Sequence, residues 1–439
     1  MKTTIEILEQ QLDSFELAKR KNALAELAEL AKSGNIELPP AGKWTNMHAH
    51  SFFSYNAYGY SPSKFAWLAK KAALALAQIV DFDVLDGLEE FLWAGEQLCL
   101  KSTVGMETRV FVEEFSDKSI NSPGEPGVSY HMGIGFVTTD ITASAAEFLG
   151  SMKKTASERN REVVKRVNLY LSGAEIDYDS DVLPLSPSGN ATERHICLAY
   201  LQKSEQNFDN KKDLAKFWAD KLGKEATGAE LLGLIRAKTM KRGGPGYVQP
   251  GQGSFPTIHD TNEFIIACGA IPTQAWLNGL SDGEARMAEL LEVGMESGVA
   301  ALNIVPDRNF TPGVRDEKLD NLYKVVELAQ SLDMPVIAGT EMNSDGQKFV
   351  DDFASDELKP LLDIFLEGAH IVYGHSVLQK QAGLGYMSSW AGKNFESIAA
   401  KNKFFKTLGE RMTPGSEQML SGVDGNNKPK EILGKICND

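Results

Sequence analysis

Apolar residues recur at helical spacing in the first part of the chain. Over residues 4–32, leucine, isoleucine and phenylalanine return every three or four positions between glutamate and lysine, which predicts amphipathic helices. A Ser-Gly-Asn turn and the pair Pro39-Pro40 end this segment. We therefore expect a helical arm over residues 1–42 that packs on the main body as a helix pair. A homo-oligomer that forms through this arm is the alternative.

Short apolar runs then alternate with helical stretches over residues 43–150 and again over 256–375. In the first part, apolar runs at 77–83 and 102–112 flank an amphipathic stretch at 86–98. This succession of strand, helix and strand predicts an α/β fold with a mostly parallel sheet or barrel.

The second part continues the same alternation. We interpret four apolar runs as strands, at 263–272, 298–305, 335–341 and 369–372. The last of these would place His375 at a strand end.

The strand signal is lost between residues 151 and 255, which we interpret as a helical insertion. It contains three amphipathic, polar stretches, at 157–171, 191–203 and 211–222. It ends in a glycine-rich stretch, 241–253, that lacks the Gly-Lys-Ser/Thr ending of a phosphate loop, so we expect a mobile loop beside the mouth of a site. Residues 376–439 predict a helical C-terminal extension.

Composition narrows the class of protein. The 439 residues are 42% hydrophobic and carry a formal net charge of −15, which is ordinary for a globular chain and disfavours a broad surface for nucleic acids or anionic membranes. The four cysteines lie far apart, so neither a disulfide framework nor a zinc ribbon is indicated. Without a signal-like start or a membrane-spanning apolar stretch, a cytoplasmic protein is the expectation.

The first candidate chemistry is an HxH pair, His48 and His50, at the end of a short expected strand. Residues two apart on a strand point to the same side, so both imidazoles can reach one metal ion, although such a pair also occurs in structural settings. Further candidates lie at other expected strand ends: Asp81, Asp83, Glu107, His131 and Glu341. Side chains at the C-terminal ends of parallel strands converge in barrels, and imidazoles with carboxylates suit Zn²⁺, Mn²⁺ or Fe²⁺ better than Mg²⁺ alone. Taken singly, Glu107 and Glu341 are each explained better as the cap of a following helix.

The order of these segments resembles the PHP (polymerase and histidinol phosphatase) family of metal-dependent phosphoesterases. The similar segments are His48-Ala49-His50-Ser51, Val80-Asp81-Phe82-Asp83, Gly105-Met106-Glu107, Tyr130-His131-Met132-Gly133 and Gly339-Thr340-Glu341-Met342-Asn343. In the insertion, Glu193-Arg194-His195-Ile196 is similar to the Gly-Arg-Pro-His segment of members that act on nucleotide phosphates. The resemblance implies a distorted (β/α)7 barrel with a helical insertion and helical N- and C-terminal extensions.

The resemblance also implies a metal centre in which several ligands are altered. The first ion would be held by His48, His50, Glu107 and Glu341, the last in place of aspartate. A second ion would share Glu107 and take His131, but its other histidine, expected near Gln274, is missing. The ligands of a third ion are replaced by Asn56, Phe82 and Asn343. We therefore expect one or two divalent transition-metal ions (Zn, Mn or Fe).

The activity implied is the hydrolysis of a phosphate ester by a metal-activated water. Arg194 would clamp phosphate oxygens, and His195 would hydrogen-bond the phosphate or protonate a leaving group. Asp83 would orient an imidazole or replace a lost ligand, and His375 is a second replacement candidate, although a structural donor is the commoner role. Two functions stay open: a hydrolase of a small phosphate ester such as a nucleotide, and a non-catalytic PHP-like protein that binds a phosphorylated ligand.

Overall fold

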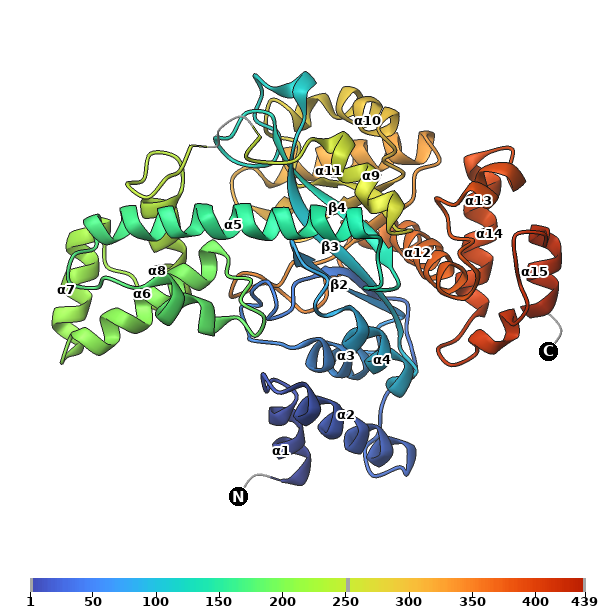
Figure 1. Cartoon of the computed structure of the whole chain (residues 1–439), viewed down its shortest axis with the longest axis horizontal. Helices are drawn as coiled ribbons and strands as arrows, with labels where there is room; N and C mark the ends of the chain where they lie inside the picture. The colour runs from blue at the N-terminus through green and yellow to red at the C-terminus, as the bar shows by residue number, and fades with distance from the viewer. Residues whose placement is uncertain (1–2, 250–252, 437–439) are drawn as a thin grey trace.

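Seven strands form one sheet in which the spatial order follows the order of the chain. The computed structural model describes residues 3–249 and 253–436. The strands are β1 (Thr45–Ala49), β2 (Leu76–Phe82), β3 (Lys101–Phe111), β4 (Val128–Phe136), β5 (Ile271–Trp276), β6 (Ala301–Ile304) and β7 (Val336–Ala338). A single bridge between Ala49 and Glu341 joins the two ends of the sheet, so the strands form a nearly closed barrel (Figure 1). The predicted distorted seven-stranded barrel is confirmed.

The barrel departs from a fully parallel one at β4. The pairs β1–β2, β2–β3, β5–β6 and β6–β7 are parallel, whereas β4 runs antiparallel to both β3 and β5. Residues 112–127 connect β3 to β4 with only a short 3₁₀ turn, so the chain reverses instead of crossing over through an α-helix.

Helices cover the barrel on its outside and form the three predicted helical parts. Around the barrel lie α3 (Pro62–Lys71), α4 (Leu88–Leu98), α9 (Ile258–Ala267), α10 (Met287–Glu296) and α11 (Arg315–Ser331). The N-terminal arm consists of α1 (Thr4–Gln11) and α2 (Leu17–Lys32). The C-terminal part consists of α12 (Leu362–Ala382), α13 (Ser389–Asn394), α14 (Ile398–Arg411) and α15 (Pro429–Ile436).

The insertion has a hydrophobic cluster of its own. Its helices are α5 (Ala143–Tyr170), α6 (Glu193–Asn207), α7 (Lys211–Leu222) and α8 (Gly228–Ile235). Buried residues that include Val167, Tyr200 and Trp218 hold these helices together. The long helix α5 starts eight residues before the expected start of the insertion and extends from the barrel to α6–α8 (Figure 1).

The expected strand at 369–372 is a helix, and the one at 263–272 is helical over its first half and enters β5 only at Ile271. Residues 263–267 belong to α9, and residues 369–372 lie in the middle of α12. Short apolar runs predict burial but do not separate a buried helix from a strand. The helix α12 is apolar on several sides because it packs against the barrel strands on one side and against α14 on the other, where Gly374 and Gly409 let the two backbones approach closely.

The arm packs on its own barrel through buried polar contacts. The Arg20 guanidinium forms a bidentate ion pair with Glu90 of α4, and both side chains are buried. The Ser61 hydroxyl, at the start of α3, donates to the Leu12 carbonyl. These contacts fix α1 and α2 on α3 and α4.

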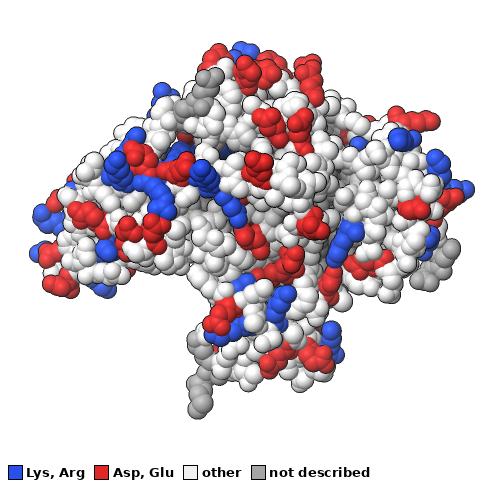
Figure 2. All heavy atoms as spheres, viewed as in Figure 1, with Lys and Arg blue, Asp and Glu red and all other residues white. Residues whose placement is uncertain are grey.

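The surface shows no large area of one charge on the face drawn in Figure 2, where acidic and basic side chains intermingle over the insertion and the arm. No helix among the described residues is long and apolar enough to cross a membrane. Cys99, Cys197 and Cys268 are free thiols, and Cys437 lies outside the described residues.

Candidate metal centre and its cavity

Two imidazoles from the end of β1 face one carboxylate from β3. The Nε2 atom of His50 lies 3.4 Å from one oxygen of Glu107, and the Nε2 atom of His48 lies 3.9 Å from the other. All three side chains are buried. Their ligand atoms lie within 4.8 Å of one another, which makes this one of two groups among the described residues with such spacing. The other group, His259, Asp260 and Glu263, is exposed on the surface of α9.

Hydrogen bonds on the opposite ring nitrogens orient both imidazoles. Nδ1 of His48 lies 2.9 Å from Oδ1 of Asn303, and Nδ1 of His50 lies 3.0 Å from the Ser54 hydroxyl. Ser54 donates its own proton to Asp81 at 2.7 Å, so it accepts from His50. Each ring therefore carries its proton on Nδ1 and turns the lone pair of Nε2 towards Glu107.

The Nε2 atoms fit a metal ion better than any partner in the protein. Both are buried without a hydrogen-bond partner among the described residues. Burial lowers the pKa of both histidines, so the rings are neutral near pH 7 and their lone pairs are free. Ligand atoms about 2.0–2.1 Å from a tetrahedral zinc ion lie about 3.3–3.4 Å apart, which matches the separation between His50 and Glu107.

Glu341, the fourth expected ligand, lies beside this cluster in an ion pair. Its carboxylate accepts from the Arg308 guanidinium at 2.5 Å and from the Gln347 amide at 3.3 Å. Burial raises the pKa of Glu341, but Arg308 outweighs this effect and holds it at about 2. Glu107 forms no ion pair with an arginine or lysine of the described residues, and burial raises its pKa to about 7. Glu341 is thus ionised at neutral pH, whereas Glu107 is balanced between its two forms.

His131 does not join the cluster, which corrects the expectation for a second ion. In the antiparallel pair β3–β4, His131 lies opposite Thr108, whereas Glu107 lies opposite Met132. Neighbours along a strand face opposite sides of the sheet, so His131 and Glu107 point to different sides. The Nε2 atom of His131 lies 2.6 Å from Asn262 of α9, outside the barrel.

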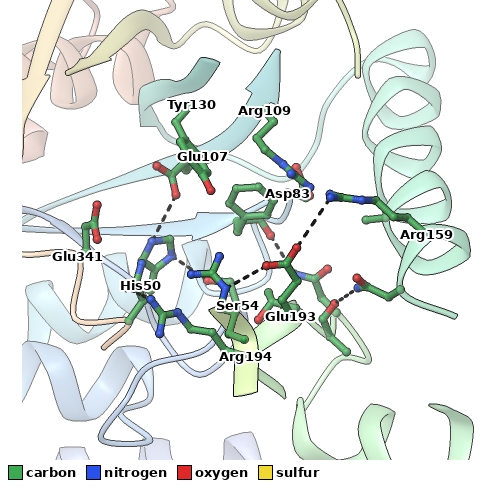
Figure 3. Close-up of a pocket in the computed structure, with 18 of the residues that line it drawn as sticks. His50, Ser54, Asp83, Glu107, Arg109, Tyr130, Arg159, Glu193, Arg194 and Glu341 are labelled. Atoms are coloured by element: carbon green, nitrogen blue, oxygen red, sulfur yellow. Dashed lines mark hydrogen bonds and ion pairs between the residues drawn. The ribbon is translucent and has the colours of Figure 1, made fainter. Parts of the chain in front are cut away.

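A cavity of about 240 Å³ opens beside His50 and Glu107, between the strand ends and the insertion (Figure 3). Six cationic side chains line it: Arg109, Arg159, Arg194, Arg236, Lys241 and Arg308. Four acidic side chains line it: Asp83, Glu107, Glu193 and Glu341. The lining therefore has a formal excess of two positive charges in a chain whose net charge is −15.

Glu193, at the start of α6, is the centre of the cationic part of the cavity. Its carboxylate lies 2.9 Å from Nε of Arg236, 2.8 Å from Nζ of Lys241 and 3.8 Å from a guanidinium nitrogen of Arg159. Burial alone would raise the pKa of Glu193, but these cations hold it well below the usual range. Glu125 pairs with Arg159 at 3.3 Å and with Arg109 at 3.2 Å, so four cations share two carboxylates and leave positive charge over for an anion.

Of the three residues expected to take part in the chemistry, Arg194 and Asp83 line the cavity and His195 does not. Arg194 donates to Asn343 at 3.0 Å and to Ser344 at 2.7 Å, and burial lowers its pKa to about 10. Asp83 accepts from the Thr108 hydroxyl at 2.6 Å, and burial raises its pKa to about 6.

His195 has a structural role, which corrects the expected contact with phosphate. It occupies the third position of α6, and its Nδ1 accepts from the Thr192 backbone N–H at the helix start. Its ring packs edge-on against Tyr55, with centroids 5.1 Å apart. The helix cap determines the direction of this side chain.

His375 cannot replace a lost ligand because it lies within α12 and both of its ring nitrogens are used. Nε2 lies 3.1 Å from the Gly135 carbonyl, and Nδ1 accepts from the Tyr386 backbone N–H at 2.8 Å. A β-carbon on Gly135 would lie 2.4 Å from this ring, so the histidine fills space that only glycine leaves open.

The residues that stand at the third-ion positions have other contacts. The Asn56 amide donates to the His50 carbonyl and accepts from the backbone of Tyr58 and Tyr60, so it organises the loop after β1. Phe82 and Asn343 line the cavity, and neither offers a strong ligand for a transition metal.

The backbone is left-handed at several of these strand ends. Seven described residues other than glycine have positive φ, and four of them lie in the loops of the site: Tyr55, Asp83, Glu341 and Met342. Such conformations cost about 1–3 kcal/mol each and persist where the surrounding structure enforces them, often at functional sites.

Five of the cavity cations were absent from the sequence-based site: Arg109, Arg159, Arg236, Lys241 and Arg308. Arg308 had the clearest signal, because it follows β6 and so lies at the C-terminal end of a parallel strand. Arg109 lies on β3 two residues after Glu107, on the same side of the strand. Arg159, Arg236 and Lys241 depend on how the insertion packs on the barrel. Lys241 is the first residue of the glycine-rich stretch 241–253, of which residues 250–252 lie outside the described residues.

No family model and no curated protein matches this chain. Among solved structures, it is similar to an amidohydrolase from Chromobacterium violaceum with bound sulfate and no metal, at 18% identity and a TM-score of 0.51 over 74% of this chain and 96% of that one. A second similar structure, a candidate metal-dependent phosphoesterase from Bifidobacterium adolescentis, has 17% identity and a TM-score of 0.47 over 75% and 98% of the two chains. At this identity, the first likeness establishes the barrel fold.

Proposed function

We propose that this protein is a metal-dependent hydrolase of small phosphate esters, of the PHP kind, with a reduced metal centre. The observation that carries the proposal is the pair of buried Nε2 atoms of His48 and His50, which face Glu107 without a hydrogen-bond partner among the described residues. A buried polar atom without a partner costs about 1–3 kcal/mol, so a bound cation explains the arrangement. With His131 turned away, a single transition-metal ion is the expected complement.

The cavity supports an anionic substrate of small size. Its excess of positive charge contrasts with the acidic chain, and a site of this kind concentrates anions. Arg194 carries a planar guanidinium suited to two phosphate oxygens at once, and its present partners are neutral oxygens that a phosphate can displace. The volume of about 240 Å³ suits a small molecule better than a polymer.

In this proposal the cavity residues have two tasks, which are to bind the anionic substrate and to transfer a proton. A bound divalent ion supplies an acidified water and polarises a phosphoryl oxygen. Arg194 and the cations around Glu193 bind and orient the anionic groups of the substrate. Asp83, with its pKa raised to about 6 by burial, is placed on the cavity wall to take a proton near neutral pH.

A second candidate function is the binding of a phosphorylated ligand without catalysis. Phe82 and Asn343 at the third-ion positions favour it, as does the ion pair that occupies Glu341. In this case the cavity would hold the ligand and the ion would have a structural role or be absent.

Metal analysis followed by a phosphatase screen tests the proposal. We expect protein purified with Zn²⁺, Mn²⁺ or Fe²⁺ to retain about one ion per chain and to release phosphate from nucleotides or sugar phosphates. His48→Ala and Glu107→Gln should lose both properties. Retained metal with no turnover of any phosphate ester would favour the binding function. Absence of any metal from the wild-type protein under metal-replete conditions would contradict the metal centre.

A further inference from the structure

Arg308 lies between the candidate metal centre and the cavity. It belongs to the short turn after β6, whereas its partner Glu341 follows β7, so two neighbouring strand ends bring them together. The guanidinium donates to Glu341 at 2.5 Å and also lines the cavity. The Arg308 side chain is 42% exposed, and that of Glu341 is 8% exposed. Arg308 therefore has access to a ligand in the cavity, while its partner is turned inward.

The hydrogen-bond capacity of Arg308 is only partly used. Its Nε is buried and has no hydrogen-bond partner among the described residues. A planar guanidinium binds an oxyanion best through two parallel N–H donors. While one of its terminal nitrogens is bound to Glu341, Arg308 cannot offer its full set of donors to a phosphate.

Glu341 is subject to two competing attractions. Its charge acts on His48, His50 and Glu107, so it lies within electrostatic reach of all three candidate ligands. A divalent ion held by those ligands would attract this carboxylate strongly. Oε2 of Glu341 is already engaged by Arg308 and by Gln347, and that contact has to weaken before the oxygen can bind an ion.

We propose that Arg308 and the metal ion compete for Glu341, and that metal binding releases the Arg308 guanidinium to bind the anionic group of the substrate. The inference rests on the proposed function, because it requires an ion at His48, His50 and Glu107. Arg308 is thus a positioning residue whose availability depends on the ion. Because coupling between two ligands is reciprocal, phosphate strengthens metal binding by the same factor by which metal strengthens phosphate binding.

The affinity for Mn²⁺, measured by electron paramagnetic resonance of the free ion, tests the competition. Arg308→Gln should bind Mn²⁺ about tenfold more tightly than the wild-type protein, because the ion no longer displaces a charge-assisted contact. Arg194→Gln is the matched control, since it removes one positive charge from the same cavity without a hydrogen bond to Glu341. An equal gain in both variants would reduce the effect to general electrostatics and overturn the inference.

A double-mutant cycle with Glu341→Gln isolates the pair. In the Glu341→Gln background, Arg308→Gln should change the Mn²⁺ affinity no more than Arg194→Gln does. A full gain in that background would overturn the inference, because the effect would not pass through Glu341. Circular dichroism checks folding, and Arg308→Lys, which keeps the charge but loses the planar fork, provides a second variant with an expected intermediate gain.

Inorganic phosphate tests the release of the guanidinium. Phosphate should raise the Mn²⁺ affinity of the wild-type protein several-fold more than that of Arg308→Gln, since part of the coupling passes through Arg308. Equal coupling in the two proteins would overturn this part of the inference. If the wild-type protein binds none of Mn²⁺, Zn²⁺ and Fe²⁺, the proposed function fails; if it binds Mn²⁺ and Arg308→Gln binds no more tightly, only the inference about Arg308 fails.

Discussion

Oδ1 of Asn303 lies 2.9 Å from Nδ1 of His48, on the ring nitrogen opposite the one that faces Glu107. This contact holds the imidazole in one orientation and fixes its proton on Nδ1. Asn303 is fully buried on β6, so its side chain has little freedom to move away. Partners of this kind orient metal-binding histidines in many proteins.

Removal of this partner should weaken metal binding without removing a ligand. Asn303→Ala is expected to lower the affinity for Zn²⁺ or Mn²⁺ about 10–100-fold, the usual effect of losing such a hydrogen bond. Asn303→Asp keeps the acceptor and should retain wild-type affinity or exceed it. Competition with a chelator of known affinity measures both variants. Wild-type affinity in Asn303→Ala would show that packing alone positions His48.

Substitutions in the buried and in the exposed group of ligand-type residues should affect the metal content differently. His50→Ala removes one of the unpartnered Nε2 atoms and should abolish stoichiometric binding, as measured by elemental analysis after dialysis. His259→Ala is the matched control, because it removes a histidine from the exposed group on α9. If His259→Ala loses the metal and His50→Ala retains it, the metal is bound by the exposed group on α9 and not by His50.

Titration of the buried Asp351 should make the free energy of unfolding depend on pH. Its carboxyl is buried and its Oδ2 has no hydrogen-bond partner among the described residues. Burial raises its pKa from 3.8 to about 7, Asp307 adds to the rise, and Lys348 opposes it. Between about pH 4 and pH 7 the folded protein therefore binds a proton that the unfolded chain releases. The free energy of unfolding should fall as the pH rises through this window, by an amount on the order of 3 kcal/mol, and level off above it.

Asp351→Asn tests this dependence, because the amide cannot ionise. The variant should be more stable than the wild-type protein at pH 8 and should lose that advantage towards pH 4, as measured by urea unfolding at several pH values. Other buried carboxyls titrate in the same range, so the difference between the two proteins is the relevant quantity. A pH-independent difference would mean that Asp351 is ionised throughout the range.

The sequence was sufficient for the barrel and for the grouping of His48, His50 and Glu107. His48, His50 and Glu107 come together because each lies at or near the end of a strand whose apolar pattern is clear, and such ends converge. The same rule placed Asp83 and Glu341 on the cavity wall. Arg308 satisfies the rule as well, and a search for cations at strand ends would have identified it.

The errors in the predicted strands and in the placement of His131 have physical causes: burial of whole segments, and the alternation of side chains along a strand. The runs that became α9 and part of α12 are buried, and burial removes the polar positions that distinguish a helix from a strand. His131 was assigned by motif order, but side chains alternate along β4, and a shift of one residue reverses the side to which a residue points. The cations of the insertion depend on tertiary packing between α5, α6 and the barrel, which local patterns do not encode.

The buried pair between Arg20 and Glu90 should make the N-terminal arm part of the cooperative fold. Arg20 is 2% exposed, Glu90 is 4% exposed, and Ser63 donates a further hydrogen bond to the same carboxylate. Arg20→Ala leaves Glu90 buried without its counter-charge, so we expect a loss of about 3–5 kcal/mol in the free energy of unfolding, measured with urea. Arg315→Ala, which breaks a partly exposed surface pair with Glu357, should cost less than about 1 kcal/mol. If Arg20→Ala costs as little as Arg315→Ala, the arm separates from α3 and α4 without disturbing the barrel, and its packing on the barrel does not contribute to the stability of the fold.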